Sequence, residues 1–557
     1  MVYNRHIQFQ ISEIKGDKIM KPVYLCILDG VAIGAKNKTN AVFEAMAEGK
    51  APFLKELFAK QYGLLGCSGR AVGLPDGTMG NSEVNHLNMG AGRVVYQSIE
   101  RINVAIEDGS FFTNHGLLKA VNNCKAKNST LHLMGIIQGH GGTVHGHINH
   151  LFALLKLAKD NGLKKIAIHI FGDGRDTDPY SLGEVYIKML QDEILSLGMK
   201  EIASVKTIMG REIAMDRDTA WGKTLIAMKA IILGETESVA GSADEAIKKS
   251  YEQKSTDEFI RPVKIGEYDG VKKEDSIIFW NYRQDRAMQL AVGFCEQDHK
   301  FFNYKKGVKP IDESLYSQII ELQNKIKGSV FVSMTEYYEG TASLTAFPEK
   351  EIPHTVGEVV SNAGLLQLRI AGTEKFAHVT GWFSGRRQNP FNGEERVLIQ
   401  DPTLKDRTEQ GKRYDLVPEM TAYLETDRVL SEIDSKNYSL IVHNFQNGDM
   451  VGHTGNLEAA TKAISVVSEC LSRIVPKWLE KGGVFILTAD HGNADEMIVE
   501  KNHNPVASTQ HSLNPVPVWI LGVDGEVKDG AIPDIGVTIL KVMGLHVPAD
   551  MNAKSLI

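Results

Sequence analysis

Long apolar runs are missing from this 557-residue sequence, because nowhere do about 18 apolar residues follow one another. A membrane-spanning helix is therefore not expected. Cysteine is also scarce, and the five cysteines form no C-x-x-C pair. Their spacing excludes a disulfide framework and a zinc ribbon, and it fits a reducing compartment. We therefore expect a cytoplasmic protein.

An excess of basic charge is missing as well, since Lys and Arg number 62, Asp and Glu number 69, and the net charge is −7. This balance argues against broad binding to nucleic acid or to an anionic membrane, although it leaves room for a local basic pocket. Residues 1–21 have mixed charge and no long apolar run, so they do not predict a signal peptide. We interpret them as an N-terminal extension without an assigned role.

What the sequence does contain is the composition of a globular protein, with 43% hydrophobic and 24% charged residues. Short β-branched runs alternate with amphipathic stretches, a pattern that predicts an α/β fold with largely parallel sheets. Strands are expected over residues 23–28, 131–137, 166–171, 202–209, 439–445 and 483–489, and helices over residues 150–159 and 182–197.

Connecting chain near Gln97 and near Lys350 indicates the domain boundaries. Residues 98–350 would then form a domain inserted between residues 22–97 and residues 351–557, which are the two parts of one outer domain.

Charged and imidazole side chains follow the strands of the middle block. The carboxyl ends of parallel strands lie at the same edge of a sheet, where ligands usually bind. We therefore expect one cleft to contain His145, Arg175, Asp176 and Arg211.

Asp and His residues follow the strands of the outer domain in the same way. Taken singly, each has a commoner explanation, a cap or turn for Asp and an exposed loop for His. Several Asp/His pairs after apolar strands favour a metal site instead, with ligands that suit Mn²⁺ or Zn²⁺ better than Ca²⁺. A set large enough for two adjacent metals comprises Asp29, Asp449, His453, Asp490, His491 and His511, with Ser82 in a Gly-marked turn.

Eight short motifs between Pro22 and the C-terminus occur in a characteristic order. They are Leu28-Asp29-Gly30, Gly80-Asn81-Ser82-Glu83, Asp173-Gly174-Arg175-Asp176-Thr177, Ala214-Met215-Asp216-Arg217-Asp218, Arg283-Gln284-Asp285-Arg286, Thr373-Glu374-Lys375, Asp449-Met450-Val451-Gly452-His453-Thr454-Gly455 and Thr488-Ala489-Asp490-His491-Gly492-Asn493. In this order they resemble the cofactor-independent (2,3-bisphosphoglycerate-independent) phosphoglycerate mutase family of the alkaline phosphatase superfamily. The resemblance implies an alkaline-phosphatase-like α/β metal domain interrupted by an inserted α/β substrate-binding domain.

The resemblance also implies a ligand set for two divalent ions. One ion would be held by Asp29, Ser82, Asp490 and His491, and the other by Asp449, His453 and His511. Manganese is the ion that the family favours, with zinc, cobalt and magnesium as alternatives. Ser82 would be the nucleophile, activated by metal coordination without a separate base.

By the same resemblance, the inserted domain holds the substrate. Glycerate would be held by His145, Arg175, Arg211 and Arg217, and the phosphoryl group by Arg283 and Arg286. Arginine suits both anionic groups because its planar fork matches carboxylate and phosphate. Lys375 would offset charge on the transferring phosphoryl group, and Asp176 would be the base that activates the acceptor hydroxyl.

The function implied is an interconversion of 3-phosphoglycerate and 2-phosphoglycerate, in glycolysis and gluconeogenesis, through a phosphoserine and without 2,3-bisphosphoglycerate. The family favours a monomer. The alternatives are a metal-dependent phosphatase or another phosphomutase on the same scaffold, and a silent homologue that only binds. The sequence departs from the family in the loop from Gln138 to His147, which adds His140, and at Gly372, where the family commonly has Glu.

Overall fold

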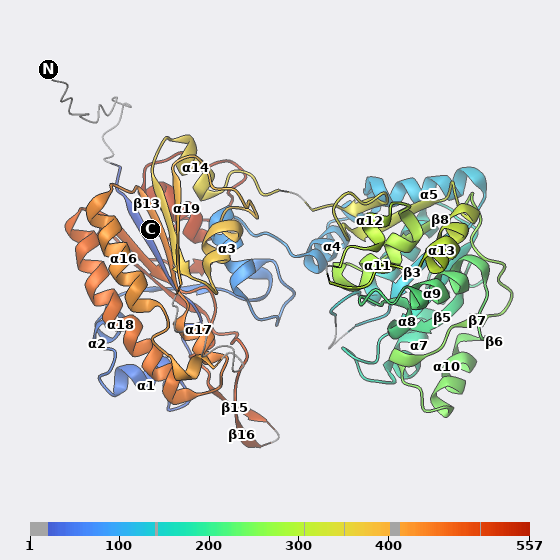
Figure 1. Cartoon of the computed structure of the whole chain (residues 1–557), viewed down its shortest axis with the longest axis horizontal. Helices are drawn as coiled ribbons and strands as arrows, with labels where there is room; N and C mark the ends of the chain where they lie inside the picture. The colour runs from blue at the N-terminus through green and yellow to red at the C-terminus, as the bar shows by residue number, and fades with distance from the viewer. Residues whose placement is uncertain (1–19, 140–142, 306, 350, 401–412, 502) are drawn as a thin grey trace. The chain divides into compact units, whose positions relative to one another are not determined.

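The chain is seen in a computed structural model that describes residues 20–139, 143–305, 307–349, 351–400, 413–501 and 503–557 (Figure 1). The N-terminal extension before Met20, His140 and Lys350 lie outside the described residues. The chain divides into two compact units. Unit 1 takes in the chain up to Gln97 and from Glu351 onwards, and unit 2 is Ser98–Lys350. No helix among the described residues is long and apolar enough to cross a membrane.

Unit 1 is built on an eight-stranded sheet with the order β12-β11-β13-β1-β14-β17-β2-β18. Its four central strands, β11, β13, β1 and β14, are parallel and buried along their whole length, as expected when helices cover both faces. Only β17 runs antiparallel, against both β14 and β2. The strands are β1 (Val23–Leu28), β2 (Gly63–Gly66), β11 (Gln367–Gly372), β12 (Glu394–Ile399), β13 (Leu440–Phe445), β14 (Val484–Thr488), β17 (Val516–Leu521) and β18 (Gly530–Ala531).

Helices form a layer on each face of this sheet (Figure 1). On one face α18 (Leu457–Glu480) packs against α1 (Ala41–Ala47), α2 (Pro52–Phe58), α16 (Ala422–Ser435) and α17 (Asn447–Gly452). On the other face α3 (Ser82–Ala91), α14 (Val356–Asn362) and α19 (Asp534–Val542) pack together. The helical period of apolar residues explains the long helix, because Ile464, Val467, Leu471, Ile474 and Trp478 are buried along one side of α18.

Unit 2 has a second eight-stranded sheet with the order β10-β9-β8-β3-β4-β5-β7-β6. Only the pairing of β5 with β7 is antiparallel, so β7 and its parallel neighbour β6 run opposite to the other six strands. Its strands are β3 (Leu131–Ile136), β4 (Ile166–Gly172), β5 (Ala203–Gly210), β6 (Ser238–Ala240), β7 (Val263–Ile265), β8 (Ser276–Phe279), β9 (Val330–Thr335) and β10 (Leu344–Phe347).

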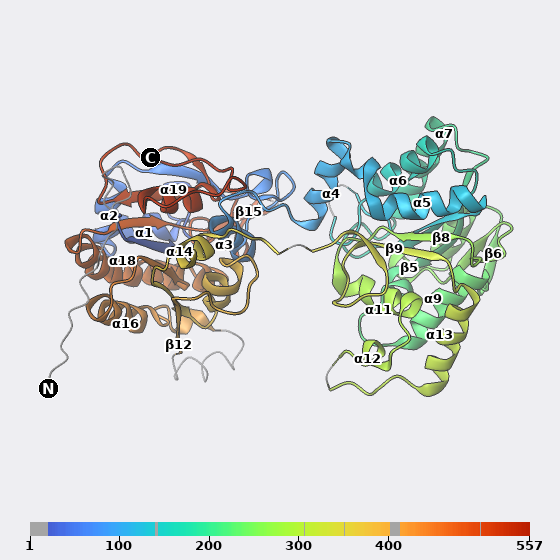
Figure 2. The same ribbon diagram turned by 90° about the horizontal axis from the view of Figure 1, so that it is seen from above.

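The helices of unit 2 lie in two layers, and a separate apolar core fills each side of the sheet (Figure 2). One layer holds α4 (Ser98–Glu107), α5 (His115–Lys127), α6 (Ile148–Asp160), α7 (Ile187–Ser196) and α10 (Ala243–Glu252). The other holds α8 (Arg211–Ala214), α9 (Trp221–Leu233), α11 (Gln284–Cys295), α12 (His299–Phe302) and α13 (Glu313–Lys325).

The predicted β-α-β-α-β pattern of the middle block is confirmed, since β3, β4 and β5 are parallel neighbours joined through α6 and α7. The helix predicted over residues 182–197 is divided, because Leu182–Tyr186 forms a π-helical turn before α7. The prediction that Ser82 lies in a turn is wrong. Ser82 is the first residue of α3, because the Asn81 side chain accepts a hydrogen bond from Val84 N and caps the helix.

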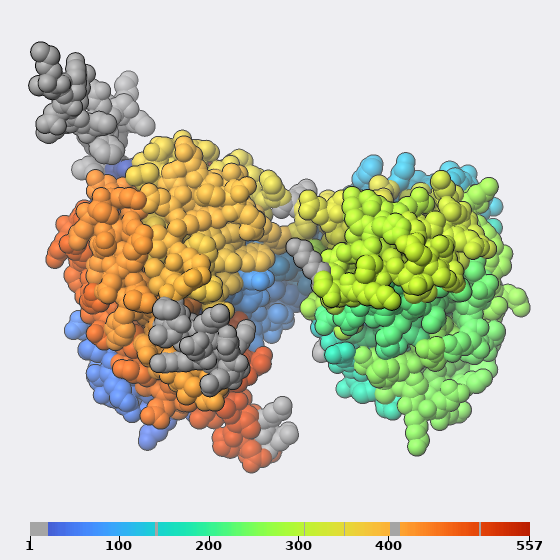
Figure 3. Space-filling model, viewed as in Figure 1, coloured from blue at the N-terminus to red at the C-terminus, as the bar shows by residue number. Residues whose placement is uncertain are grey.

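A small hairpin, β15 (Ile498–Lys501) and β16 (Asn504–Ala507), projects from the surface of unit 1 (Figure 3). It lies between two site residues in the sequence, His491 and His511. The four residues of β16 are exposed.

Candidate active site and metal centre

The site in unit 1 lies where four neighbouring parallel strands end. In sheet order, a polar residue follows β11, β13, β1 and β14, and these residues are Lys375, Asp449, Asp29 and the pair Asp490 and His491. Crossover connections on both faces open a crevice at such an edge, where ligands bind. The topology therefore gathers residues that are hundreds of positions apart in the sequence.

Ser82 lies at the centre of this group. Its Oγ is 2.9 Å from His491 Nε2, 2.6 Å from Lys375 Nζ and 3.4 Å from Asp29 Oδ1. The side chain is buried. A buried hydroxyl that accepts a hydrogen bond from an ammonium group is well placed to act as a nucleophile, because that donor stabilises negative charge on the oxygen.

Lys375 supplies positive charge among the acidic residues. Its Nζ donates to Asp29 Oδ1 at 2.7 Å and to Asp449 Oδ2 at 2.8 Å. Burial by itself would lower the pKa of Lys375, but these two carboxylates outweigh it and hold the pKa above its usual range. Burial would likewise raise the pKa of Asp449, and Lys375 instead keeps it well below the usual range.

Two histidines converge on Asp449 from the opposite side. Asp449 Oδ1 is 3.1 Å from His453 Nε2 and 3.3 Å from His511 Nε2. The helical turn of α17 explains the first contact, because it brings residues four apart to one face. Each imidazole forms a hydrogen bond between its Nδ1 and a backbone carbonyl oxygen. The partner is Thr509 O for His453 and Gly80 O for His511, and both distances are 2.8 Å.

These residues fit a two-metal centre. An Nδ1–H that donates to a carbonyl leaves Nε2 as a free lone pair, the usual arrangement of a metal-binding histidine. Asp490 Oδ2 is buried and has no hydrogen-bond partner among the described residues. The donor atoms of Asp29, His86 and Asp490 form one group, and those of Asp449, His491 and His511 form another. Within each group the atoms lie within 4.8 Å of one another. Carboxylate and imidazole donors suit divalent transition metals.

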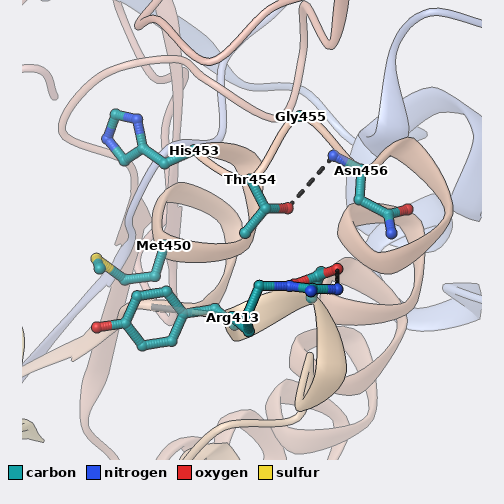
Figure 4. A pocket seen from close by; sticks show the side chains of 8 residues that line it. Arg413, Met450, His453, Thr454, Gly455 and Asn456 are labelled. Carbon is teal, nitrogen blue, oxygen red and sulfur yellow. Dashed lines mark hydrogen bonds and ion pairs between the residues drawn. The ribbon is translucent and has the colours of Figure 1, made fainter. Parts of the chain in front are cut away.

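A pocket of about 660 Å³ opens beside His453, and Figure 4 shows the side chains around it. His453 and Met450 come from the α17 segment, and Arg413 is held by a forked ion pair with Asp415, at 2.9 and 3.0 Å. The side chain of His453 is 39% exposed, so this edge of the centre is open. Tyr414, also in the lining, donates its hydroxyl to Glu374 Oε1 at 2.8 Å.

The sequence analysis missed two residues of this centre, His86 and Asn444. Asn444 Nδ2 donates to Asp29 Oδ2 at 2.8 Å and lies 3.1 Å from His86 Nε2. Because an amide N–H can only donate, His86 Nε2 accepts, and its Nδ1–H donates to Ser82 O at 2.8 Å. Burial lowers the pKa of His86 to about 4. The four-residue spacing from Ser82 to His86 was a signal for a shared helix face.

In unit 2, Arg211 is the centre of a second group at the ends of β3, β4 and β5. It is the first residue of α8, directly after β5, and it is buried. Its Nη1 donates to both Asp173 and Asp176, and its Nη2 lies 3.0 Å from His145 Nε2. Burial would raise the pKa of Asp176, but the hydrogen bond from Arg211 lowers it, so Asp176 is ionised at neutral pH.

Four further arginines, Arg175, Arg217, Arg283 and Arg286, belong to this group, and their ion pairs involve two carboxylates, Asp285 and Glu258. Asp285 accepts from Arg217 at 2.7 Å and pairs with Arg283 at 3.1 Å. Burial lowers the pKa of Arg286, and the charges of Arg211, Arg217 and Arg175 lower it further. This mutual repulsion indicates an excess of positive charge, which an anionic ligand would relieve. Arg175 is the most exposed, at 57%, and its contact is to Glu258 at 3.4 Å.

The altered loop before His145 has a structural explanation in Gln138. Its Oε1 accepts from the backbone N–H groups of Val144, His145 and Gly146, at 3.1, 2.7 and 3.0 Å. Its Nε2 donates to Asp173 Oδ2 at 3.0 Å. A single buried amide therefore ties the loop of His145 to the end of β4. The sequence analysis singled out this loop but missed the role of Gln138, because a glutamine in a sequence does not show which groups it will bind.

The fold and the site are those of an α/β enzyme with a serine at a carboxylate and imidazole centre. Residues 102–339, which lie within unit 2, match the family model described as BPG-independent PGAM N-terminus. The 2,3-bisphosphoglycerate-independent phosphoglycerate mutase of Clostridium acetobutylicum is 45% identical over 544 residues, which cover 96% of this chain and 99% of the relative. The enzyme of the same name from Clostridium novyi is 44% identical over 550 residues, with the same coverage.

A solved structure is similar over nearly the whole chain too. The crystal structure of Leishmania mexicana phosphoglycerate mutase at low cobalt concentration is 26% identical, covers 97% of this chain and 98% of its own, and has a TM-score of 0.57. The chain belongs to the 2,3-bisphosphoglycerate-independent phosphoglycerate mutase family, and it is an isomerase. The predicted family and the predicted two-domain α/β fold class are thereby confirmed.

Proposed function

We propose that this chain interconverts 3-phosphoglycerate and 2-phosphoglycerate through a phosphoserine at Ser82, without 2,3-bisphosphoglycerate. The observation that carries the proposal is the surroundings of Ser82 Oγ, which lies 2.6 Å from Lys375 Nζ and 2.9 Å from His491 Nε2. The names of the curated relatives agree with this reaction. The site in unit 2 adds a cluster of arginines that suits a substrate with a carboxylate and a phosphate.

Two divalent ions complete the site in this proposal. One would be held by Asp29, Ser82, Asp490 and His491, and the other by Asp449, His453 and His511, with manganese as the preferred ion and zinc, cobalt or magnesium as alternatives. When bound, such ions favour the deprotonated serine hydroxyl and withdraw charge from the phosphoryl oxygens. Asp490 Oδ2, which is buried and has no hydrogen-bond partner among the described residues, supports this assignment.

The protein groups supply nucleophile, charge and orientation. The Ser82 hydroxyl gives up its proton and its Oγ–P bond forms as the bond between phosphorus and the 3-oxygen of the substrate breaks. The 3-oxygen takes up one proton to give glycerate, so the proton count is unchanged. Lys375 offsets the negative charge of the transferring group at the serine oxygen. In the second half, Asp176 accepts the proton of the 2-hydroxyl, which then takes the phosphoryl group back from Ser82.

Unit 2 holds the glycerate between the two half-reactions in this proposal. Arg211 and His145 contact each other at 3.0 Å and would orient the carboxylate, with Arg217 and Arg175 around them. Arg283 and Arg286 would bind the phosphoryl group. Retention of glycerate and exclusion of water decide between a mutase and a phosphatase, because water would hydrolyse the phosphoserine. We also propose that the enzyme acts as a cytoplasmic monomer.

The test is turnover of 3-phosphoglycerate by metal-stripped protein, with and without added Mn²⁺ and with no bisphosphoglycerate present. Both 2-phosphoglycerate and free phosphate are followed. We expect 2-phosphoglycerate only when metal is added. Free phosphate as the main product would replace the mutase with a phosphatase. If neither product forms with Mn²⁺, the assay is repeated with Zn²⁺, Co²⁺ and Mg²⁺. Absence of both products with all four ions would contradict the proposal altogether.

A further inference from the structure

Gly372 ends β11 and begins the turn that carries Lys375. Its carbonyl accepts a hydrogen bond from Lys375 N at 3.2 Å, and the residue is buried. Its φ is not in the left-handed region, so its backbone conformation is open to any residue. Any constraint on the residue at position 372 must therefore come from the side chains around it.

The space beside Gly372 is filled by the side chain of Gln446, which follows β13, the neighbour of β11. A Cβ placed on residue 372 would lie 2.7 Å from Gln446 Cδ, and nearer still to Gln446 Nε2 and Thr421 Oγ1. Such distances are well inside van der Waals contact. The amide of Gln446 thus occupies the volume that a side chain at position 372 would need.

This amide belongs to a buried hydrogen-bond network. Gln446 Nε2 donates to Thr421 Oγ1 at 2.9 Å, and the Thr421 hydroxyl donates to Glu425 Oε1. Glu425 Oε2 in turn lies 3.0 Å from His443 Nε2. All four side chains are 1% exposed or less. Burial and the hydrogen bond to Thr421 therefore hold the Gln446 amide, whose Oε1 has no hydrogen-bond partner among the described residues.

We infer that Gln446 is a positioning residue for Lys375, because its amide packs where a side chain at position 372 would lie and so fixes the turn from Gly372 to Lys375. That turn sets Lys375 Nζ at 2.6 to 2.8 Å from Ser82, Asp29 and Asp449. The inference rests on the proposed function, in which Lys375 acts on the transferring phosphoryl group.

The test moves the glutamine side chain from position 446, after β13, to position 372, at the end of β11. Gly372→Gln and Gln446→Ala are made singly and together, so that in the double variant the amide enters the same space from β11. Gly372→Ala adds only the Cβ. The matched control is Gly222→Ala, since a Cβ at position 222 meets nothing within 4 Å and the φ of Gly222 is not left-handed either.

We expect Gly372→Ala and Gly372→Gln to lower kcat about 100-fold and Gln446→Ala about 10-fold, because small displacements of a catalytic group are costly. The double variant should recover to within about 3-fold of the wild type. KM for 3-phosphoglycerate should stay within about 2-fold throughout, because the substrate arginines lie in unit 2, and Gly222→Ala should be unchanged.

A second readout does not need turnover. The rate at which N-hydroxysuccinimide acetate acetylates Lys375, read by mass spectrometry, should be low in the wild type, rise in the single variants and fall again in the double variant. If the wild type has no mutase activity, the proposed function fails while this pattern still tests the positioning of Lys375. A Gly372→Ala variant as active and as slowly acetylated as Gly222→Ala would overturn the inference, as would a double variant no better than Gly372→Gln.

Discussion

The two groups of functional residues stand at equivalent places, the carboxyl edge of a parallel sheet, but they differ in burial and in how fully they are paired. In unit 1, Asp29, Ser82, Lys375 and Asp490 are 5% exposed or less and contact one another through short hydrogen bonds. In unit 2, Arg211, Asp173 and His145 are buried to that degree, but the outer arginines are not. The side chains of Arg175, Arg217 and Arg283 are 57%, 45% and 52% exposed.

This difference matches the two tasks that the proposed reaction sets. A group that makes and breaks bonds to phosphorus needs fixed neighbours and little water, because electrostatic stabilisation is strongest in a preorganised, dry site. A group that admits and releases an anionic substrate needs free donors at the surface. The four predictions below test the comparison, from the largest expected effect on turnover to the smallest.

Ser82→Ala removes the nucleophile from the buried group. We expect turnover to fall by at least about 10⁴-fold, because no other described hydroxyl contacts both Lys375 and His491. The protein is incubated with 3-phosphoglycerate, the reaction is quenched, and phosphopeptides are mapped. Phosphate should be found on Ser82 in the wild type and not in the variant. Ser68→Ala, in the neighbouring loop, is the control. Phosphate on another residue of the wild type would refute the assignment.

Arg211→Lys changes the one arginine of unit 2 that is buried like the residues of unit 1. We expect kcat/KM to fall about 100-fold, because a lysine cannot contact Asp173, Asp176 and His145 with one ammonium group. Steady-state kinetics and a thermal unfolding curve separate this loss from misfolding. A variant within about 3-fold of the wild type would mean that burial in unit 2 does not matter for function.

Arg217→Ala removes an exposed arginine. We expect KM for 3-phosphoglycerate to rise about 10-fold with a smaller effect on kcat, because an exposed ion pair such as that with Asp285 is weak and its arginine is free to bind an anion. Arg261→Ala is the matched control. Arg261 is 53% exposed and paired with Glu237, and it should have no effect. Equal KM values for the two variants would contradict the substrate role of Arg217.

His145 should contribute the least to the change of turnover with pH. Burial, and then the charge of Arg211, lowers its pKa to about 4, so it stays neutral above about pH 5 and contributes nothing to a change in rate between pH 8 and 6. Because the folded pKa lies below the unfolded value, His145 leaves stability unaffected above about pH 6.5. Stability is lost as the pH falls from there towards 4. An NMR titration, assigned with His145→Gln, checks this. A midpoint near pH 6.5 would show that His145 is open to solvent.

Part of the site could be predicted because it depends on local sequence. The strand ends at Leu28, Phe445 and Thr488 were visible as apolar runs, and the polar residues after them could be assigned to one edge by the rule for parallel strands. Asp449 and His453 are four residues apart, a spacing that places both on one side of a helical turn. By contrast, Ser82 was wrongly predicted in a turn, because the preceding Gly80 hid the capping role of Asn81.

Other parts could not be predicted, because they are made by residues that meet only in the folded chain. Asn444 joins Asp29 to His86, Gln138 ties the loop of His145 to Asp173, and Gln446 fills the space beside Gly372. Each is an amide inside a buried network, and a glutamine or asparagine in a sequence gives no sign of the donors and acceptors that it will satisfy.

The sequence by itself determined the α/β class, the β-α-β-α-β succession of residues 131–209 and the chemical types available at each strand end. These follow from hydrophobic periodicity and from the handedness of parallel crossovers, which act over short stretches of chain. Only the tertiary structure decided which of these groups are buried, which oxygen Lys375 contacts and which arginines stay exposed. Burial and pairing depend on packing between distant segments, and no single stretch of sequence contains that information.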